Sequence, residues 1–563
     1  MAGSVGEHTF ECQARAPRLG AVVALAAGVA LLSASCSGGR SQATAPAAPT
    51  TSGKEFLLLR LATDTGIDYL DPGLSFTPEG LSVLWNVYLP LLGYKHVNGP
   101  GGATIVPYLA RALPTVSADG TTYTLFLRRG LKYSDGAPVR ASDFEATIER
   151  DYRLDSPGVA FFSNIVGTAE YGRTRKGTIA GISSDDATRR ITIRLLAPQA
   201  DFENVLASEF AALVPAGAPA TDTSIHPLPA TGPYLITSYR PGDKIVEARN
   251  PHFDASAFGG NVPAGNPDSV VWDVVGDDGA ALQRVIGGKD DWDGYHAIPA
   301  SQLSAVERKY AKQLRRYVPP NTYYFFMNTR VPPFTSLQVR QAVNYAIDRD
   351  ALVKLYEGLA VPTENVLPPT YLQYARHDFY PHDLAKAKQL VARSGFKGMG
   401  VTVWSHQFGP DSKASAYLVA VLNSLGFKAK EKIVNSAVYW ATIGNESKRA
   451  QIGFADWFQD YPHPLDWFDV LLNGEKITKR YNSDYANFDD PSVNAEIDAL
   501  RRHVLTGAVN RQWARLDATV MRQAPWVPFL NRQFTDFFSR RVDLACYVNQ
   551  VVYGFDYATI CVR

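Results

Sequence analysis

The chain has 563 residues, enough for more than one hydrophobic core, because single cores stop growing at about 250–300 residues. Hydrophobic residues make up 46% and charged residues 20% of the sequence, which is typical of a folded protein and argues against a disordered or fibrous one. The formal net charge is +1 and no long run of lysine and arginine occurs, so no nucleic-acid partner is predicted.

The first element is an apolar run over residues 20–32, preceded by two arginines. A transmembrane helix needs about 20 apolar residues, so this shorter run has the form of a signal-peptide core. Small residues and then Cys36 follow, which resembles a bacterial lipobox, although Ser33 stands where leucine is usual. We therefore predict a lipoprotein signal peptide over 1–35 and lipidation of Cys36, with plain secretion as the alternative.

Residues 36–54 are rich in Gly, Ser, Ala, Pro and Thr, and are predicted to be a flexible tether. The lipid would hold the protein at the outer face of the cytoplasmic membrane. Removal of the signal peptide and lipidation of Cys36 leave Cys546 and Cys561, whose spacing in an exported chain favours a disulfide. Such a loop of about 15 residues contributes roughly 3 kcal/mol in the chain-entropy model. Two cysteines alone do not suggest a metal site, and no cofactor is predicted.

Alternating or continuous apolar residues predict strands in the first half of the chain. These strands are expected over 56–62, 122–127, 190–195 and 269–275. Ser142, followed by acidic residues, predicts the N-cap of a helix. Residues 211–229, rich in Ala, Pro and Thr, are predicted to cross between domains.

From residue 322 onward the pattern becomes that of an α/β protein. Helices are predicted over 337–357, 383–394 and 414–425, from Pro491, and around 513–521. Strands at 401–404 and 430–434 flank the third of these helices, which predicts a βαβ unit.

Enzyme signatures are absent from the sequence: it contains no G-x-S-x-G, G-x-x-x-x-G-K-[ST], G-x-G-x-x-G or H-E-x-x-H pattern. The carboxylate pairs Asp277/Asp278 and Asp290/Asp291 could serve a glycosidase, but their glycine-rich surroundings favour solvated turns. His463, between two prolines, is expected at a turn or at the edge of a binding site. No catalytic or metal-binding residue is predicted.

The most informative stretch is residues 455–468 (ADWFQDYPHPLDWF), with three acids, five aromatic rings and two prolines. The prolines exclude a regular helix at its centre. Rings beside unbalanced carboxylates suit a concave site for a cation and apolar groups. The alternative is a proline-bent surface turn whose rings pack on the core.

Five segments together resemble the family 5 extracellular solute-binding proteins of bacterial ABC importers, the oligopeptide- and dipeptide-binding lipoproteins. The most specific is YSDGAPVRASDF at 133–144, similar to the family pattern F-x-D-G-x-P-x-x-A-x-D-V. The others are TGPY with ARNPHF at 231–234 and 248–253, YFFMNTRVPPF with VRQAVNYAIDR at 324–334 and 339–349, DLAKAKQL at 383–390, and the 455–468 stretch, similar to G-W-x-x-D-Y-x-x-P.

This resemblance implies an α/β fold of the two-lobe, type II periplasmic-binding-protein class, with an additional subdomain on the N-terminal lobe. The boundaries that it implies are 55–95, 226–318 and 531–563 for lobe I, 96–225 for the subdomain, and 319–530 for lobe II.

In the family, the ligand is an extended strand in the interlobe cleft, and one acid holds its ammonium. By motif position that acid is Asp460, with Trp457 and Phe458 supplying backbone contacts and a wall. The further ligand-binding residues expected on this resemblance are Tyr461, Asn321 and Tyr323. Asp456 replaces the usual glycine; it would favour a cationic ligand or point outward, and we expect it to point outward.

The resemblance also implies a function. The protein would be a lipid-anchored, non-catalytic, monomeric receptor that binds peptides and delivers them to an ABC permease. The alternatives are a metal chelate, an opine-like compound or an oligosaccharide as ligand, a sensing role, or an exported hydrolase.

Overall fold

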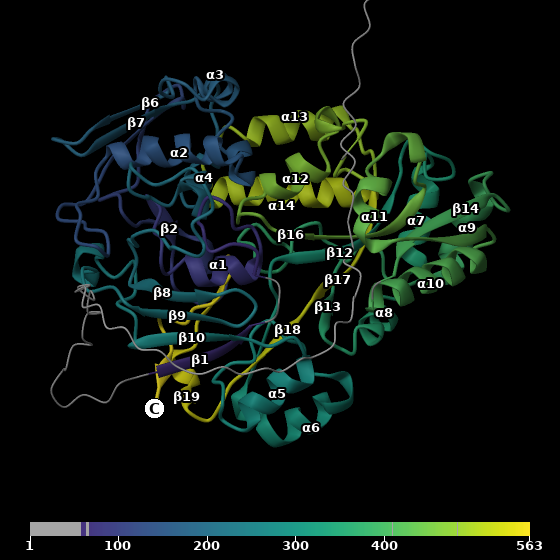
Figure 1. Ribbon diagram of the computed structural model, residues 1–563. Coiled ribbons are helices and arrows are strands. Elements are labelled where there is room, and N and C mark those ends of the chain that lie inside the picture. Colours follow the sequence, from purple (N-terminus) through teal and green to yellow (C-terminus); the bar gives the residue numbers. More distant parts are fainter. Residues whose placement is uncertain (1–57, 64–66, 408, 481) are drawn as a thin grey trace, which may run out of the picture. The chain divides into compact units, whose positions relative to one another are not determined.

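The computed structural model describes residues 58–63, 67–407, 409–480 and 482–563, all within one compact unit, Phe56–Arg563 (Figure 1). The predicted signal peptide, the tether and Cys36 lie outside the described residues. Within the described ranges, no helix is both long and apolar enough to cross a bilayer.

A four-stranded sheet holds the first strand of the described chain. Its order is β1-β10-β9-β8, with β1 and β10 parallel and the other pairs antiparallel. The bounds are β1 (Leu58–Thr63), β8 (Tyr234–Arg240), β9 (Lys244–Arg249) and β10 (Ser269–Val274). The predicted strands at 56–62 and 269–275 are thus confirmed. Just before β8, a Cβ on Gly232 would lie 2.3 Å from the backbone oxygen of Asn86, which explains the glycine of that motif.

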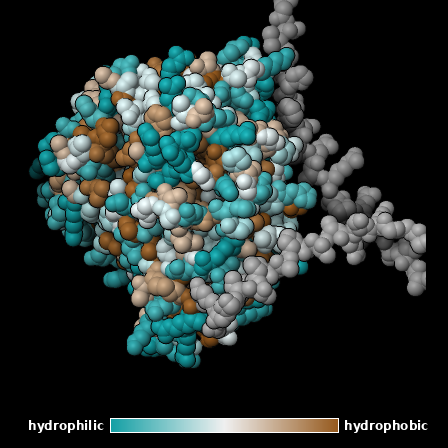
Figure 2. All heavy atoms as spheres, turned by 90° about the vertical axis from the view of Figure 1, so that its left-hand side faces the viewer, coloured by the Kyte–Doolittle hydropathy of each residue, from teal (hydrophilic) through white to brown (hydrophobic). Residues whose placement is uncertain are grey.

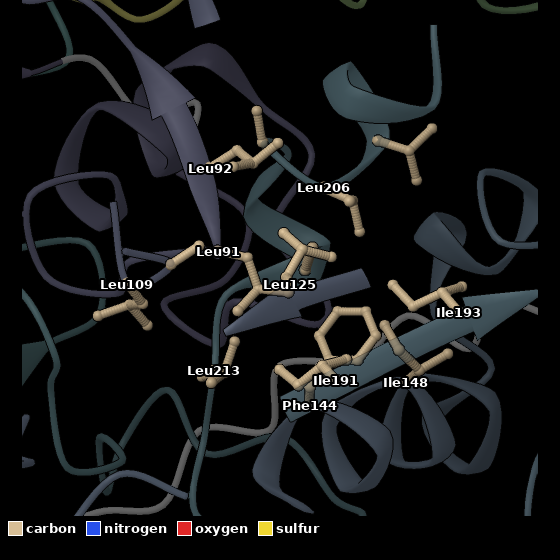
Figure 3. Close-up of a cluster of buried hydrophobic side chains, with 14 of the residues drawn as sticks. Leu91, Leu92, Leu109, Leu125, Phe144, Ile148, Ile191, Ile193, Leu206 and Leu213 are labelled. Carbon is tan, nitrogen blue, oxygen red and sulfur yellow. The ribbon is translucent and has the colours of Figure 1, made fainter. Parts of the chain in front are cut away.

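A second four-stranded sheet, in the order β4-β5-β7-β6, is antiparallel throughout. Its strands are β4 (Thr115–Val116), β5 (Thr122–Phe126), β6 (Ile182–Asp185) and β7 (Arg190–Arg194), and helix α2 (Ser142–Leu154) accompanies it. Leu125 of β5 and Ile191 of β7 meet Phe144 and Ile148 of α2 in one buried cluster, which also takes in Leu206 (Figure 3).

Ser142 does not cap α2 as predicted. The N-cap is Ala141, and Ser142 is the first helical residue. Its amide and hydroxyl both donate to the Asp186 carboxylate, at 2.9 Å each, so a residue from a distant turn takes the capping role.

The largest sheet is six-stranded, in the order β13-β17-β12-β16-β14-β15. The bounds are β12 (Asn321–Met327), β13 (Ala360–Pro362), β14 (Gly400–His406), β15 (Lys428–Val434), β16 (Ile452–Phe458) and β17 (Trp526–Arg532). Every residue of β12 is buried. Helix α10 (Gly409–Ser424) joins the parallel strands β14 and β15, which confirms the predicted βαβ unit.

Helices cover both faces of this sheet. On one face lie α7 (Leu337–Ala346), α8 (Arg349–Leu355), α9 (Leu384–Arg393) and α10, and on the other α12 (Leu465–Leu471), α13 (Pro491–Leu500) and α14 (Gly507–Gln523). The single helix predicted over 337–357 is wrong. Asp348 starts a second helix by accepting a hydrogen bond from the amide of Ala351 at 3.0 Å.

Six α-helices of the described ranges remain, five of them before β12 in the chain, whereas the sixth, α11, packs against β14 and β16 of the six-stranded sheet. They are α1 (Pro78–Leu84), α3 (Thr168–Thr174), α4 (Phe202–Val205), α5 (Asp278–Ile286), α6 (Ala300–Tyr310) and α11 (Ser436–Ile443). Asp277 caps α5 through the amide of Ala280. Asp290 and Asp291 are fully buried and paired with Arg284 and Arg541, so the predicted solvated turn at that pair is wrong.

The chain passes twice between the β1 sheet and the six-stranded sheet. Strand β11 (Leu314–Tyr317) leads into β12, β17 leads into β18 (Phe534–Phe537), and β11 and β18 pair antiparallel. Two α/β lobes joined by two crossings confirm the expected fold class. The exact residue boundaries of lobes and subdomain stay predictions.

The C-terminal segment returns to the first lobe, where Phe538 bridges to Trp292. The Cys546–Cys561 disulfide is present, with 5.6 Å between the two Cα atoms, and it holds β19 (Val542–Asp543) near β22 (Cys561–Val562). On the face of the molecule that carries the first lobe, hydrophilic residues are interspersed with scattered hydrophobic residues (Figure 2).

Candidate ligand-binding site

The two crossings meet at Asn321, the first residue of β12. Its side-chain amide donates to the backbone oxygens of Pro319 and Arg532, at 2.7 and 3.1 Å, and its oxygen accepts from the amide of Arg532 at 2.7 Å. Asn321 is fully buried. Its side chain therefore links the two chain crossings, and its predicted contact with ligand stays a prediction.

The 455–468 stretch combines three local structures. Residues up to Phe458 form β16, residues 459–464 form a turn, and α12 begins at Leu465. The prolines end the strand rather than disrupt it, because both lie in the turn. Asp460, the predicted ammonium-binding acid, lies in this turn with an exposed side chain.

Asp466 fixes the backbone of that turn. Its Oδ2 accepts from the amide of Asp460 at 3.0 Å and from the indole Nε1 of Trp457 at 3.3 Å, and its side chain is fully buried. Asp466 itself lies in the first turn of α12. However, Asp466 also holds in place two of the residues predicted to bind ligand, which the sequence did not indicate.

The carboxyls of Asp460 and Asp466 influence each other's protonation. Burial, and then the charge of Asp460, raise the pKa of Asp466 well above its usual value. The protein around Asp460 displaces enough water to raise its pKa to about 6, although its side chain still reaches solvent. Protonation is therefore favoured at the deeper carboxyl of Asp466, and the negative charge is favoured at the outer carboxyl of Asp460.

Two further acids come from the segment around α4. Burial raises the pKa of Glu209 to about 7, and the Asp460 carboxylate adds to this effect, which places the two acids near each other. Asp201, 5% exposed, accepts a hydrogen bond from the hydroxyl of Tyr461 at 2.7 Å. Residues from the two lobes thus contribute carboxyls to one site, which favours a cationic group of a ligand.

Other contacts across this interface are polar and involve backbone. The amide of Ala200 donates to the oxygen of Arg501 at 3.1 Å, and the side chain of Gln459 donates to the oxygen of Val551 at 2.9 Å. A cavity of about 30 Å³ remains beside Gln459 and Tyr371. This volume is far below the roughly 300–1,000 Å³ that is typical of a small-molecule site.

The aromatic residues predicted for the site lie at the end of the six-stranded sheet. Phe458 is 41% exposed, and its ring centroid is 6.1 Å from that of Tyr323 and 6.3 Å from that of Phe534. Tyr323 is 3% exposed. Phe458 can therefore contact a ligand directly, whereas Tyr323 mainly supports it from below.

The expectation that Asp456 points outward is wrong. Asp456 is opposite Tyr323 on the neighbouring strand and is half-buried. Burial and the nearby Asp411 carboxylate raise the pKa of Asp456 to about 7, while Arg532 opposes this rise. Its carboxyl is thus close enough to Asp411 and Arg532 to interact with them electrostatically.

Some residues near the site were not predicted at all. Three of them lie outside the segments that carry the predicted chemistry: Glu209, Asp411 and Arg532. A fourth, Asp466, lies within the 455–468 stretch, but no contact with ligand-binding residues was expected of it. His463 is 1% exposed and buried in the turn, where burial lowers its pKa to about 4. It is a neutral structural residue of the turn.

Two observations bear on other kinds of site. Within the described ranges, no group of three or more His, Cys, Asp or Glu residues is arranged to hold a metal ion. A separate cavity of about 220 Å³, beside the N-terminus of α8, includes none of the predicted ligand-binding residues.

The chain was compared with known protein families. The profile "Bacterial extracellular solute-binding proteins, family 5 Middle" matches residues 104–479. Glutathione-binding protein GsiB of Salmonella choleraesuis (strain SC-B67) is 25% identical over 461 residues, which cover 79% of this chain and 84% of that protein. Heme-binding protein A of Haemophilus influenzae (strain ATCC 51907 / DSM 11121 / KW20 / Rd) is 28% identical over 478 residues, covering 78% and 81%.

Solved structures share the fold. Clavulanic acid biosynthesis oligopeptide binding protein 2 superposes with a TM-score of 0.81 at 24% identity, over 90% of this chain and 95% of that one. The periplasmic binding protein DppA from Helicobacter pylori, in complex with the peptide STSA, has a TM-score of 0.66 at 20% identity, over 90% and 98%. The chain therefore belongs to the family 5 extracellular solute-binding proteins, the substrate-binding components of bacterial ABC importers.

Proposed function

We propose that this protein is a non-catalytic receptor that binds peptides between its lobes and delivers them to an ABC permease. The observation that carries this proposal is Asp460, an exposed carboxylate whose backbone amide is fixed by Asp466 and which has Glu209 near it. Such a carboxylate suits the terminal ammonium of a peptide, because a partly desolvated acid needs a cationic partner.

The relatives favour a peptide. GsiB is named for glutathione, two of the similar structures are named for oligopeptides or contain a peptide, and the Haemophilus protein is named for heme. Heme is therefore the specific alternative ligand. Main-chain hydrogen bonds to an extended ligand would give affinity for many sequences.

The cell envelope is the proposed location. The signal-peptide form of residues 1–35 and the lipobox-like Cys36 support attachment to the outer face of the cytoplasmic membrane through lipid, and the receptor would act as a monomer. Metabolic labelling with a radioactive fatty acid should mark the wild-type protein and leave Cys36→Ser unlabelled; an unlabelled wild type would refute the lipid anchor.

Titration calorimetry with a mixed peptide library, and separately with heme, tests the ligand class. We expect heat from peptides with micromolar or tighter affinity. Asp460→Asn should weaken peptide binding by about 2 kcal/mol or more, as for truncation of one member of a charge pair. Glu475→Gln, an exposed acid of lobe II, is the matched control and should bind normally. Heat with heme and none with any peptide would overturn the proposal.

A further inference from the structure

A group of interacting side chains near the end of β16 lies outside the predicted ammonium site. We call it the Asp456 cluster; its members are Asp411, Asp456, Arg532, Tyr323 and Tyr356. They come from the N-terminal part of α10, from β16, from the end of β17, from β12 and from the residue after α8. The six-stranded sheet therefore assembles them from five separate segments.

The floor of the cluster is buried and ordered by direct contacts. The hydroxyl of Tyr356 donates to Oδ1 of Asp411 at 2.7 Å. The rings of Tyr356 and Tyr323 meet edge to face, with centroids 5.7 Å apart. Tyr323 is the cross-strand neighbour of Asp456, so both side chains lie on one face of the sheet.

The charges of the cluster do not balance. Asp411 and Asp456 interact electrostatically with each other and both with one cation, Arg532, which also interacts with the Tyr323 hydroxyl. Nε2 of His406 lies 3.6 Å from Oδ2 of Asp411, but burial lowers the pKa of His406, which disfavours the cationic form of its ring. When both carboxyls ionise, one unit of negative charge remains uncompensated.

Hydrogen bonding leaves room for a further donor. Asp411 is 4% exposed, and its Oδ2 accepts no hydrogen bond from any residue in the described part of the chain. The Asp456 carboxylate likewise accepts none from another described residue. Burial raises the pKa of Asp411 to about 6 and that of Asp456 to about 7. A buried carboxylate without a donor is unfavourable unless a cation pairs with it.

The open side of the cluster is aromatic. Phe458, 41% exposed, lies two residues beyond Asp456 on the same face of β16, and the Arg532 guanidinium lies over the ring of Phe534 at 5.2 Å. The methylene groups of a long cationic side chain pack well on such rings while its charged end reaches a carboxylate.

We propose that the Asp456 cluster binds a cationic side chain of the ligand, a lysine-type ammonium or an arginine-type guanidinium. The inference rests on the proposed peptide-binding function and specifies the substrate class. Asp456 and Asp460 are four residues apart, which corresponds to at most about 13 Å of extended chain. An extended peptide whose amino-terminal ammonium is held by Asp460 can therefore bring the cationic side chain of one of its next residues to Asp456.

Calorimetry with tetra-alanine peptides, in which position two, three or four is lysine, norleucine or glutamate, tests the proposal. Norleucine keeps the length and apolar stem of lysine and removes the charge. At one position, we expect lysine to bind about thirtyfold or more tightly than norleucine, the effect of a partly desolvated charge pair. Glutamate should bind most weakly there.

Three variants test which carboxylate produces the preference for lysine over norleucine. Asp456→Asn should abolish the preference for lysine over norleucine and leave the norleucine peptide unchanged, whereas Asp460→Asn should weaken both peptides equally. Glu475→Gln should change neither. Asp456 is only half-buried, so Asp456→Asn should fold, which circular dichroism melts check. Binding of the peptides to the wild type at pH 5, below the pKa values of Asp411 and Asp456, should reduce the same preference for lysine without a substitution.

The outcomes separate the two proposals. Equal affinity for lysine and norleucine at every position, or a lysine preference that persists in Asp456→Asn, overturns the role of the cluster and leaves peptide binding intact. No binding of any peptide overturns both.

Discussion

Replacement of Asp466 tests whether a buried acid positions the ligand-binding carboxylate. Oδ2 of Asp466 accepts from the Asp460 amide at 3.0 Å and from the Trp457 indole at 3.3 Å. Leucine fills a similar volume without an acceptor, so Asp466→Leu leaves both donors without this partner. A buried donor left unsatisfied costs about 1–3 kcal/mol. The Asp460 turn is near solvent, so water will replace part of the loss, and we expect the lower end of that range for each donor.

The free energy lost with these two hydrogen bonds should lower both the stability of the fold and the affinity for ligand, because the turn that carries Asp460 can move once Asp466 no longer holds it. We expect Asp466→Leu to weaken binding of a library peptide about tenfold, equivalent to ~1.4 kcal/mol. Asp466→Asn should bind within about twofold of the wild type, since one amide oxygen can accept both hydrogen bonds and burial raises the pKa of the native acid, which favours its uncharged form. Calorimetry supplies the affinities and thermal melts monitor the fold.

Two results would refute this reasoning. Wild-type affinity in the leucine variant would show that Asp466 does not position Asp460. An asparagine variant as weak as the leucine variant would show that the charge of Asp466, and not its acceptor, matters for binding.

Three further measurements test other parts of the structure. Peptide affinity should rise between pH 5 and 7.5, because Asp460 and Glu209, with pKa values of about 6 and 7, must ionise to hold an ammonium. The polar groups around them are Asp201, Asp466 and Tyr461. Asp460→Asn should flatten the rise in affinity, and an unchanged slope would contradict this explanation. Arg150→Met should reduce the free energy of unfolding by about 3–5 kcal/mol, since it leaves the fully buried Asp71 without its cationic partner. Arg173→Met, at an exposed ion pair, should have little effect on stability, and equal effects of the two variants in denaturant melts would refute this. The double variant Cys546→Ser, Cys561→Ser should unfold at a lower temperature, with a loss of about 3 kcal/mol for its 15-residue separation, and an unchanged melting temperature would show that the tail is held by packing alone.

The stability that the Arg150–Asp71 pair contributes should also depend on pH. Burial alone would raise the pKa of Asp71, but the hydrogen bond and charge of Arg150 lower it overall. A native pKa below the unfolded value of about 3.9 means that the pair contributes fully above that pH. Its contribution is lost as pH falls through the native pKa, so Arg150→Met and the wild type should converge in stability in strong acid.

Local signals were readable wherever one segment determines its own structure. The apolar spacing of α10 and α14 and the acid before α9 describe helices that form as predicted, with Asp383 accepting from the amide of Lys386 at 2.8 Å. The helix boundary at Asp348 is not evident from the sequence, because charged residues alternate on both sides of it and an aspartate among them can be either a surface residue or a new cap. Only the backbone conformation decides between them.

Roles that depend on partners far along the chain could not be read in this way. Asp290 and Asp291 looked solvated because their neighbours are glycine and lysine. Arg541, which pairs with Asp291, lies 250 residues further on. Similarly, the spacing around Ser142 indicated a cap, and a carboxylate 44 residues away occupied the site.

The charge of the binding site illustrates the same limit and determines the nature of the ligand. The whole chain has a formal net charge of +1, which by itself indicates no preference for a charged partner. Yet the fold brings Glu209 to Asp460 across 251 residues, and Asp411 to Asp456 across 45. Each pair places carboxyls in surroundings that raise their pKa, and Arg532 balances only one of them. Because selectivity depends on a local excess of charge and not on the total charge, the assembled carboxyls support the proposal of a cationic peptide as ligand.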